Sequence, residues 1–358
     1  MREPRRIAIG SGETESLVWI GAGLLSCAER YLVSPSGRFL LVTCAGARQP
    51  AQRIRAALSD RILADIEIDD REERKTLAAV SHIADAALAA GARRDDALVA
   101  VGGGVVCDVA GFAAAILLRG IAWNAVPTTT GAMADAAIGG KTGVDHAAGK
   151  NLLGAFHPPS AVVIDPEAAA TLPDRDFRAG LVEAFKAAWI ADAGLAKRAE
   201  DAIEGILRRE EPALEDLLAG SAGIKAAIVS EDLKEENRRR LLNFGHTLGH
   251  AFEAAGGYRK LRHGEAVAWG IAASLEISRA RAGFREGEAL RIHRVLRRLG
   301  PFPEPVRDPK ALAPYLSRDK KGSARGIAGV VLEAIGLARI DEAIPLEEWL
   351  EAASRVRL

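Results

Sequence analysis

Three of the chain's seven histidines lie within one stretch of eighteen residues, and their spacing could hold a divalent metal ion. His246 and His250 are four positions apart, which places them on one face of a helix, one turn from each other. His263 follows a Gly-Gly-Tyr loop and could fold back onto them. Histidine pairs at this spacing also occur in helices that bind no metal. The zincin motif is excluded, because Thr247 follows His246 where that motif has its glutamate base.

A carboxylate that could join these histidines lies on another predicted helix, which starts at Leu172-Pro173-Asp174. The apolar row of this helix is predicted to face a core: Phe177, Leu181, Phe185 and Trp189. Glu183 and Lys186 fall off that row. One interpretation is that Glu183 and Lys186 form an exposed ion pair. The other is that the Glu183 carboxylate offsets the charge of a metal ion, which neutral imidazoles leave uncompensated. Such a metal with an open coordination position would assist chemistry on hydroxyl groups.

Glycines follow the predicted strand at residues 97–101. Gly102, Gly103 and Gly104 would let backbone amides approach a phosphate at the start of the next helix, as in a dinucleotide or sugar phosphate site. The alternative is a tight turn with no ligand, since the order is not GxGxxG. Asp108 is either a charge in the first turn of that helix or a polar contact to a cofactor.

Hydroxyl and basic side chains follow the next predicted strand, at residues 122–126. Thr128, Thr129 and Thr130 come at its end, and open α/β sheets bind ligands along this edge. A glycine-rich segment then carries Lys141, Lys150 and Asn151, which predicts an anion cradle. The segment is not a Walker A loop, because position 135 is Asp. A solvated turn with ordinary surface lysines is the alternative.

Further basic residues come later in the chain. Lys225 lies in a predicted helix, and the run from Arg238 to Arg240 ends shortly before Asn243. A triple arginine usually marks a solvated helix face, but here it could also clamp a carboxylate or phosphate. The pair Lys320-Lys321 is by itself only part of a charged loop.

The elements that must position these residues alternate in the first half of the chain. The sequence predicts strands at residues 38–43, 66–68, 97–101, 122–126 and 161–165, with helices at 50–63 and 74–90. This alternation is typical of a parallel sheet with crossover helices. After residue 173 the pattern is helical almost to the end. We therefore predict an α/β domain over residues 1–172 and a mostly helical domain over residues 173–358.

Composition limits the class of protein. A chain of 358 residues favours two domains, and 48 basic against 48 acidic residues give no excess charge for nucleic acid or an anionic membrane. Cys27, Cys44 and Cys107 are too few and too widely spaced for a disulfide framework or a zinc knuckle. The N-terminus lacks a signal-peptide pattern, and the longest apolar run, residues 110–118, cannot span a bilayer. We expect a cytoplasmic, unprocessed enzyme.

Eight motifs, in order and covering nearly the whole chain, resemble the 3-dehydroquinate synthase family. They are Gly102-Gly-Gly-Val-Val-Cys-Asp108-Val-Ala-Gly-Phe112, Arg119-Gly120, Val126-Pro-Thr-Thr129, Asp135-x-x-x-Gly-Gly-Lys141-Thr, Gly149-Lys-Asn151, Gly180-Leu-Val-Glu183-x-x-Lys186, Asn243-Phe-Gly-His246-Thr-x-Gly-His250 and His263-Gly-Glu265. The resemblance implies a Rossmann-like, NAD-binding N-terminal domain, a helical metal-binding C-terminal domain, an active site between them and a homodimer.

The resemblance also implies a reaction. The family converts 3-deoxy-D-arabino-heptulosonate 7-phosphate into 3-dehydroquinate and phosphate, the second step of the shikimate pathway. The expected course is transient oxidation by NAD⁺, phosphate elimination, reduction and an intramolecular aldol closure. A metal, Zn²⁺ or Co²⁺, would be held by Glu183, His246 and His263.

The same resemblance implies roles for individual residues. Contacts to NAD are expected from Glu72, Lys75, Gly103, Gly104, Asp108, Thr128, Thr129, Asp135, Lys141, Lys150, Thr171 and Leu172. Contacts to substrate are expected from Arg119, Lys141, Lys150, Asn151, Lys225, Arg239, Asn243, His250, Lys320 and Lys321. The catalytic set is Asp135, Lys141, Glu183, Lys225, Arg239, Asn243 and His250, with Lys186 and Glu235 as polar partners.

Departures from the family pattern leave alternatives open. Cys44 and Gly46 replace the polar residues that usually hold the adenosine, so we expect weaker NAD binding, and Ala136 and Ala137 replace two serines. Another sugar phosphate cyclase of the 2-epi-5-epi-valiolone synthase type would act on a substrate without the carboxylate. A metal-dependent polyol dehydrogenase would release reduced cofactor, and a catalytically silent nucleotide-binding module would hold no metal.

Overall fold

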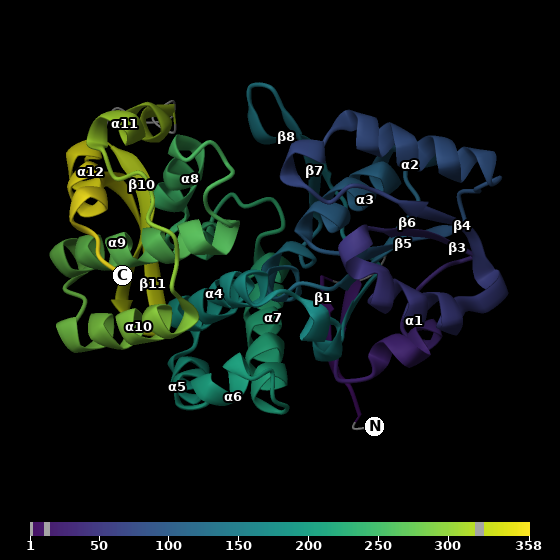
Figure 1. Ribbon diagram of the computed structural model, residues 1–358, viewed down its shortest axis with the longest axis horizontal. Helices are drawn as coiled ribbons and strands as arrows, with labels where there is room; N and C mark the ends of the chain where they lie inside the picture. The colour runs from purple at the N-terminus through teal and green to yellow at the C-terminus, as the bar shows by residue number, and fades with distance from the viewer. Residues whose placement is uncertain (1–2, 11–14, 319–325) are drawn as a thin grey trace. The chain divides into compact units, whose positions relative to one another are not determined.

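The structure is a computed structural model that describes residues 3–10, 15–318 and 326–358 (Figure 1). Contacts divide the chain into two compact units. The first comprises Met1–Pro173 with Lys225–Lys234, and the second comprises Asp174–Ile224 with Glu235–Leu358. Helix α7, Ala213–Glu231, therefore contributes its last residues to the first unit.

A seven-stranded sheet forms the centre of the first unit, in the order β1-β2-β9-β6-β5-β3-β4. Its strands are β1 (Arg5–Ile9), β2 (Ser16–Ile20), β3 (Phe39–Thr43), β4 (Ile62–Glu67), β5 (Ala97–Gly102), β6 (Ala122–Pro127) and β9 (Ala161–Ile164). All neighbours pair in parallel except β1, which is antiparallel to β2 at the edge. Every residue of β3, β5 and β9 is buried, because helices cover both faces of such a sheet. The predicted parallel sheet is confirmed.

The crossover helices place the glycine and threonine segments at one edge of this sheet. Helix α1 (Arg48–Leu58) covers one face, and α2 (Leu77–Ala89) and α3 (Gly104–Ile116) cover the other (Figure 1). The chain runs outward from β3 to β4 and then returns to β5 on the other side of β3. The strand order thus reverses between β3 and β5, which is where open α/β sheets bind ligands.

Several predicted boundaries in the first unit were wrong. The helix predicted over residues 50–63 ends at Leu58, because Ser59 adopts a φ of 50° and β4 already begins at Ile62. The helix predicted from residue 74 begins only at Leu77, where the Thr76 hydroxyl caps it by accepting a hydrogen bond from the Ala79 N–H. The short strands β1, at the edge, and β2, next to it, were not predicted.

The glycine-rich segment after Asp135 is a β-hairpin, where the sequence analysis expected a loop that cradles an anion. Strands β7 (Lys141–His146) and β8 (Gly149–Phe156) pair antiparallel, with Lys141 opposite Phe156. Gly143 and Gly154 face each other so closely that a Cβ on either would overlap the opposite backbone. The glycines therefore serve strand pairing here, and the hairpin carries Lys141, Lys150 and Asn151.

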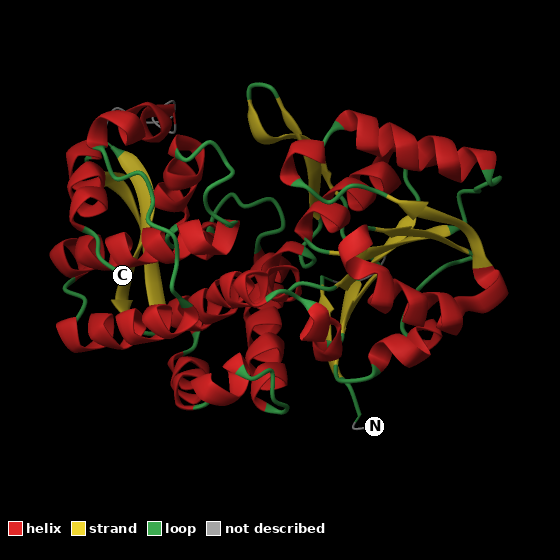
Figure 2. Cartoon of the chain, viewed as in Figure 1, coloured by secondary structure: helices red, strands yellow, loops and turns green. Residues whose placement is uncertain are grey.

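The second unit is mostly helical, with one hairpin (Figure 2). Its elements are α4 (Asp174–Ala191), α5 (Ala193–Asp201), α6 (Ile203–Leu207), most of α7, α8 (His246–Ala255), α9 (His263–Ala282), α10 (Glu286–Leu299), α11 (Pro309–Arg318), β10 (Ile327–Ala334), β11 (Leu337–Ile344) and α12 (Leu346–Arg355). Helix α9 is central, since residues from all sides of it are buried. The hairpin β10–β11 was not predicted.

The apolar row of α4 faces the core as predicted. Phe177, Leu181, Phe185 and Trp189 are each at most 1% exposed. No helix among the described ranges is long and apolar enough to cross a membrane.

A buried carboxylate before β5 makes a testable contribution to stability. Asp96 accepts hydrogen bonds from the Ser36 hydroxyl (2.7 Å), the Arg93 N–H (2.7 Å) and the Arg38 Nε and Nη2 (2.9 Å each). Burial raises the pKa of Asp96, but these hydrogen bonds and the Arg38 charge outweigh burial and leave the pKa below its ordinary value. The ionised form therefore stabilises the fold.

Asp96→Asn should lower the free energy of unfolding by about 2–3 kcal/mol at pH 7, because charged hydrogen bonds are lost in a buried place. The contribution is complete above the unfolded-state pKa near 4 and is lost as the pH falls through the lower folded-state pKa. The difference between wild type and variant should therefore shrink below about pH 4. Urea denaturation at several pH values measures it, with exposed Asp95→Asn as the matched control.

Candidate functional site

Close packing of α8 against α9 brings the three histidines together. Gly245, with a φ of 81°, precedes His246, the first residue of α8. A Cβ on Gly249 would lie 3.3 Å from the backbone of Ala266, and one on Gly270 would overlap the carbonyl oxygen of Gly245. Larger residues at these positions would push the two helices apart. Close packing of α8 against α9 therefore explains why residues without a Cβ occupy these positions.

The start of α9 is fixed against α4, which carries Glu183. Glu265 is 1% exposed and accepts hydrogen bonds from the Arg262 N–H (2.8 Å) and from Arg175 Nε and Nη2 (2.6 and 2.8 Å). Gly264 lies directly on the backbone of Ala179, where any Cβ would overlap the carbonyl oxygen. These contacts place His263, the first residue of α9, beside Glu183.

Glu183 faces two of the histidines with one carboxylate oxygen. Its Oε1 lies 3.5 Å from His263 Nε2 and 3.8 Å from His246 Nε2, and its Oε2 accepts a hydrogen bond from Lys186 Nζ at 2.5 Å. Glu183 and Lys186 are 4% and 2% exposed, so the interpretation as a solvent-exposed pair was wrong. Within the described part of the chain, the buried Oε1 has no hydrogen-bond partner.

His250 belongs to the same group. Its ring centroid lies 5.3 Å from that of His246 and 5.8 Å from that of His263. Each of the three rings has one nitrogen that lies within 4.8 Å of a nitrogen of the other two rings. Four side chains that prefer a divalent metal therefore converge: Glu183, His246, His250 and His263.

The hydrogen bonds of the rings orient the nitrogens. His246 Nδ1 lies 3.3 Å from the carbonyl oxygen of Phe244, which can only accept, so Nδ1 carries the proton and the Nε2 lone pair faces Glu183. His263 Nδ1 lies 3.2 Å from Glu253 Oε2. Burial lowers the pKa of His263, but the hydrogen bond and charge of Glu253 and the charge of Glu183 raise it above its ordinary value. A metal that binds His263 through Nε2 must displace the second proton of the imidazolium from that nitrogen and leave the Nδ1 proton in place.

Gly264→Ala should disturb this site from the backbone side. The added Cβ forces α9 away from α4, so we expect a loss of stability of about 3 kcal/mol or more. Zinc affinity should fall with it, because His263 moves with the start of α9. Thermal unfolding in chelator and zinc titration measure the two effects. Gly287→Ala on α10, where a Cβ meets nothing within 4 Å, should change neither; equal behaviour of the two variants would contradict the packing argument.

In the first unit, Lys75 connects several of the predicted cofactor residues. Lys75 is 3% exposed and donates to Asp108 Oδ2 at 2.5 Å and to Asn151 Oδ1. The backbone N–H of Asn151 donates to Asp145 Oδ1 at 2.8 Å. Beside them, Lys150 Nζ lies 2.9 Å from Glu72 Oε1. The structure thus brings Glu72, Lys75, Asp108, Lys150 and Asn151 together.

Asp108 is the fifth residue of α3, so its interpretation as a charge in the first helical turn was wrong. Burial raises the pKa of Asp108 to about 6, although the Lys75 charge and hydrogen bond act in the opposite direction. This carboxyl group is thus ionised near neutral pH and titrates just below it.

The glycine and threonine segments lie side by side at the sheet edge. Gly102 is in register with Pro127, and the Thr128 N–H donates to the Gly102 carbonyl at 2.9 Å. Gly103 and Gly104 begin α3, and a Cβ on Gly103 would lie 3.1 Å from the Thr129 methyl group. Gly103 and Gly104 thus lie at a helix start, where backbone N–H groups have no partner within the helix, and a phosphate at this place stays a prediction.

The remaining predicted residues of the first unit lie in short helical segments and at the start of a strand. Asp135 accepts a hydrogen bond from Lys225 Nζ, which is 7% exposed on α7. Lys141 is exposed at the start of β7, and Thr171 and Leu172 lie at the end of a 3-10 helix, Pro166–Thr171. Arg119 and the residue before it, Leu118, both lie in the left-handed region of the backbone, with φ values of 69° and 52°, respectively.

Two residues of the predicted carboxylate clamp, Arg239 and Asn243, lie in the second unit. Arg239 is 1% exposed in a 3-10 helix, Arg238–Asn243, and Asn243 Nδ2 donates to Glu235 Oε1 at 2.9 Å. Lys225, predicted to share the clamp, lies in the first unit beside Asp135. Lys320 and Lys321 lie outside the described residues.

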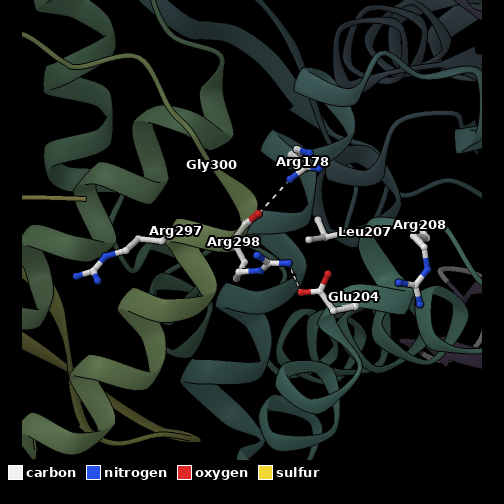
Figure 3. A pocket seen from close by; sticks show the side chains of 7 residues that line it. All are labelled: Arg178, Glu204, Leu207, Arg208, Arg297, Arg298 and Gly300. Carbon is white, nitrogen blue, oxygen red and sulfur yellow. Dashed lines mark hydrogen bonds and ion pairs between the residues drawn. The ribbon is translucent and has the colours of Figure 1, made fainter.

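A separate pocket of the second unit, of about 350 Å³, does not contain the predicted site (Figure 3). It is lined by Arg178, Glu204, Leu207, Arg208, Arg297, Arg298 and Gly300. Arg298 pairs with Glu204, and Arg178 donates to the Arg298 carbonyl at 3.0 Å.

Two residues of the site were missed by the sequence analysis. Asp145 anchors the backbone of Asn151, and Glu253 contacts His263. Glu253 follows His246 by seven positions, so helical spacing alone places it on the same face as the histidine pair. That spacing was the available signal for Glu253.

The chain matches known proteins over both units. Residues 65–179 match the family model for the N-terminal part of 3-dehydroquinate synthase, and residues 180–322 match the C-terminal part. A 3-dehydroquinate synthase from Acidithiobacillus ferrooxidans is 38% identical over 349 residues, 95% of each chain.

Among solved structures, 2-epi-5-epi-valiolone synthase from Streptomyces hygroscopicus, with NAD⁺ and Zn²⁺ bound, is 29% identical at a TM-score of 0.83 over 98% of each chain. A 2-deoxy-scyllo-inosose synthase complex shares the fold, at a TM-score of 0.87 and 24% identity over 99% of this chain and 100% of that one.

The parallel-sheet unit and the helical unit with its carboxylate and histidines define the fold class of the sugar phosphate cyclases. Within that class, the sequence match is decisive. The chain belongs to the 3-dehydroquinate synthase family.

Proposed function

We propose that this protein converts 3-deoxy-D-arabino-heptulosonate 7-phosphate into 3-dehydroquinate and phosphate. It would act as a carbon–oxygen lyase of the shikimate pathway, upstream of chorismate and the aromatic amino acids. The observation that carries the proposal is the position of Glu183 Oε1 between two histidine Nε2 atoms, in a chain that matches the family over both units.

The residues of the second unit fit a divalent metal. Oε1 of Glu183 is buried, has no hydrogen-bond partner among the described residues, and is approached by His246 and His263 at distances too long for strong hydrogen bonds. We therefore propose Glu183, His246 and His263 as its ligands. Zn²⁺ or Co²⁺ would supply a Lewis acid that acidifies a substrate hydroxyl group. Lys186 holds the other oxygen of Glu183 and so fixes the direction of Oε1.

The sheet edge of the first unit fits a dinucleotide. The amides of Gly103 and Gly104 at the start of α3 suit its phosphates, with Thr128 and Thr129 on the neighbouring strand end. The other proposed NAD contacts are Glu72, Lys75, Asp108, Asp135, Lys141, Lys150, Thr171 and Leu172. NAD⁺ would supply a hydride acceptor that is regenerated in each turnover.

The basic side chains divide between the two anionic groups of the substrate. We assign the phosphate to Arg119, Lys141, Lys150, Asn151, His250 and one of Lys320 and Lys321. Lys225, Arg239 and Asn243 would hold the carboxylate, with Asn243 oriented by Glu235. Asp135 accepts a hydrogen bond from Lys225, which would hold its carboxylate for a role close to the reacting carbon atoms.

Three wider features belong to the same proposal. Residues 1–172 would form the NAD-binding domain, and residues 173–358 the metal- and substrate-binding domain. The enzyme would be a cytoplasmic homodimer, in which Arg119 could serve the site of the partner subunit.

A carboxylate-free cyclase reaction is the second candidate, because the fold is shared with 2-epi-5-epi-valiolone synthase. The buried Arg239 favours the heptulosonate substrate, since a buried guanidinium suits a carboxylate. A polyol dehydrogenase would need fewer phosphate-binding groups.

Phosphate release from the heptulosonate phosphate, with NAD⁺ and zinc present, tests the proposal. Phosphate and dehydroquinate should form in equal amounts with no accumulation of NADH at 340 nm. Activity only with sedoheptulose 7-phosphate would move the protein to the carboxylate-free cyclases. Steady NADH formation from a simple polyol would make it a dehydrogenase.

A further inference from the structure

One buried carboxylate beside the histidines has no role in the function proposed above. Glu253 lies on α8 and is 5% exposed. Its Oε2 lies 3.2 Å from Nδ1 of His263, on the side of the ring away from Glu183. A buried carboxylate needs a compensating partner, so this contact is a substantial interaction.

We propose that Glu253 is a positioning residue for the metal site, which fixes the ring and tautomer of His263. The inference rests on the proposed metal site. Because an ionised carboxylate can only accept, Nδ1 of His263 must carry the proton that lies between them. The Nε2 lone pair is then directed to the side of Glu183 Oε1, 3.5 Å away.

The two histidines nearest Glu183 are oriented in unequal ways. His246 has a neutral acceptor at Nδ1, the carbonyl of Phe244 at 3.3 Å, whereas His263 has a carboxylate. A carboxylate behind a metal-ligating histidine fixes its orientation and raises its basicity as a ligand. Glu253 thus makes His263 the stronger ligand of the two.

Charge balance supports the same role. The charge of Glu183 is largely offset by Lys186, whose Nζ lies 2.5 Å from Oε2. Those two residues alone would leave the charge of a divalent ion with little compensation. Glu253 adds one negative charge behind the imidazole of His263, which it contacts at Nδ1.

Glu253→Gln tests this inference, because it keeps the shape of the side chain and a hydrogen-bond acceptor but removes the charge. In metal-free full-length protein, competition with a chromogenic chelator should show zinc affinity about 10–100-fold weaker than wild type. Glu288→Gln on α10 is the matched control, a buried carboxylate of the same unit that accepts from the Ile335 N–H at 3.2 Å. The control should lose stability without losing zinc affinity.

The outcomes separate this inference from the function that it rests on. Wild-type zinc affinity in Glu253→Gln would overturn the role of Glu253 and leave the metal site standing. Failure of the wild-type protein to bind zinc would overturn the metal site itself. A measurement that needs no variant is ¹⁵N NMR of the histidines in metal-free wild type at alkaline pH. It should find His263 protonated at Nδ1, and a proton at Nε2 would overturn the inference.

Discussion

His263→Ala should weaken zinc binding by about 10²–10³-fold and reduce turnover at least as much. Zinc sites contribute about 10–16 kcal/mol over four ligands, so one ligand accounts for roughly 3–4 kcal/mol. His263 also lies nearer to Glu183 Oε1 than His246 does, 3.5 Å against 3.8 Å. Zinc competition titrations and phosphate release at saturating zinc measure the two effects.

His250→Ala makes the experiment decisive about which residues hold the metal. The three histidine rings are close enough to form an all-histidine site, whereas we propose Glu183, His246 and His263 as ligands. The proposal predicts that His250→Ala changes zinc affinity by less than about 10-fold while it still impairs turnover. His293→Ala on α10, outside the group, should leave zinc affinity unchanged. Equal zinc loss in His250→Ala and His263→Ala would contradict the proposed ligand set.

The parallel sheet could be predicted from the sequence because its strands are buried on both faces. β3, β5 and β9 are continuous apolar runs bounded by turn residues, and their predicted limits differ from the structure by one residue. The hairpin β7–β8 has no such run, and in β10 the apolar run is interrupted by Gly329. In β7–β8 the strands contain glycines that resemble loop residues, and their pairing depends on contacts across the hairpin.

The members of the histidine group were predictable from the sequence, but the burial of Glu183 beside them was not. The i, i+4 spacing identifies His246 and His250, and the motif order identifies His263 and Glu183. The i, i+3 spacing predicts that Glu183 pairs with Lys186, but the burial of the pair depends on how α4 packs in the core, which no local pattern reveals. Packing of α8 against α9 places Glu253 beside His263.

Backbone strain is a signal that only the structure supplies. Arg119, Asn151 and Glu235 all have φ between 55° and 69°, in the left-handed region that residues with a Cβ rarely adopt. All three were singled out by motif resemblance as substrate residues or their polar partners. Strained residues persist where the surroundings fix them, often at functional sites. Four further residues outside the predicted site share this φ region, Ser59, Leu118, Arg209 and Tyr258, so backbone strain alone does not identify the site.

Arg239→Met should lower kcat/KM for the heptulosonate phosphate by about 10²–10³-fold, because loss of a buried charged partner costs about 2–5 kcal/mol. Arg239 is 1% exposed, so in the proposed contact water could not replace its guanidinium beside the substrate carboxylate. Arg239→Lys should fall between wild type and Met, since it keeps the charge but loses the planar fork. Arg238→Met, at the exposed neighbouring residue, is the matched control and should have little effect.

The specificity of Arg239 for the carboxylate can be tested separately from folding. Affinities for the heptulosonate phosphate and for a carboxylate-free heptulose 7-phosphate are compared in wild type and Arg239→Met. The wild type should prefer the carboxylate ligand, and the variant should lose that preference while it keeps its affinity for the carboxylate-free ligand. An equal loss of affinity for both ligands would mean that Arg239 supports the site as a whole. A preference retained by the variant would place the carboxylate elsewhere and strengthen the carboxylate-free cyclase as the function of this chain.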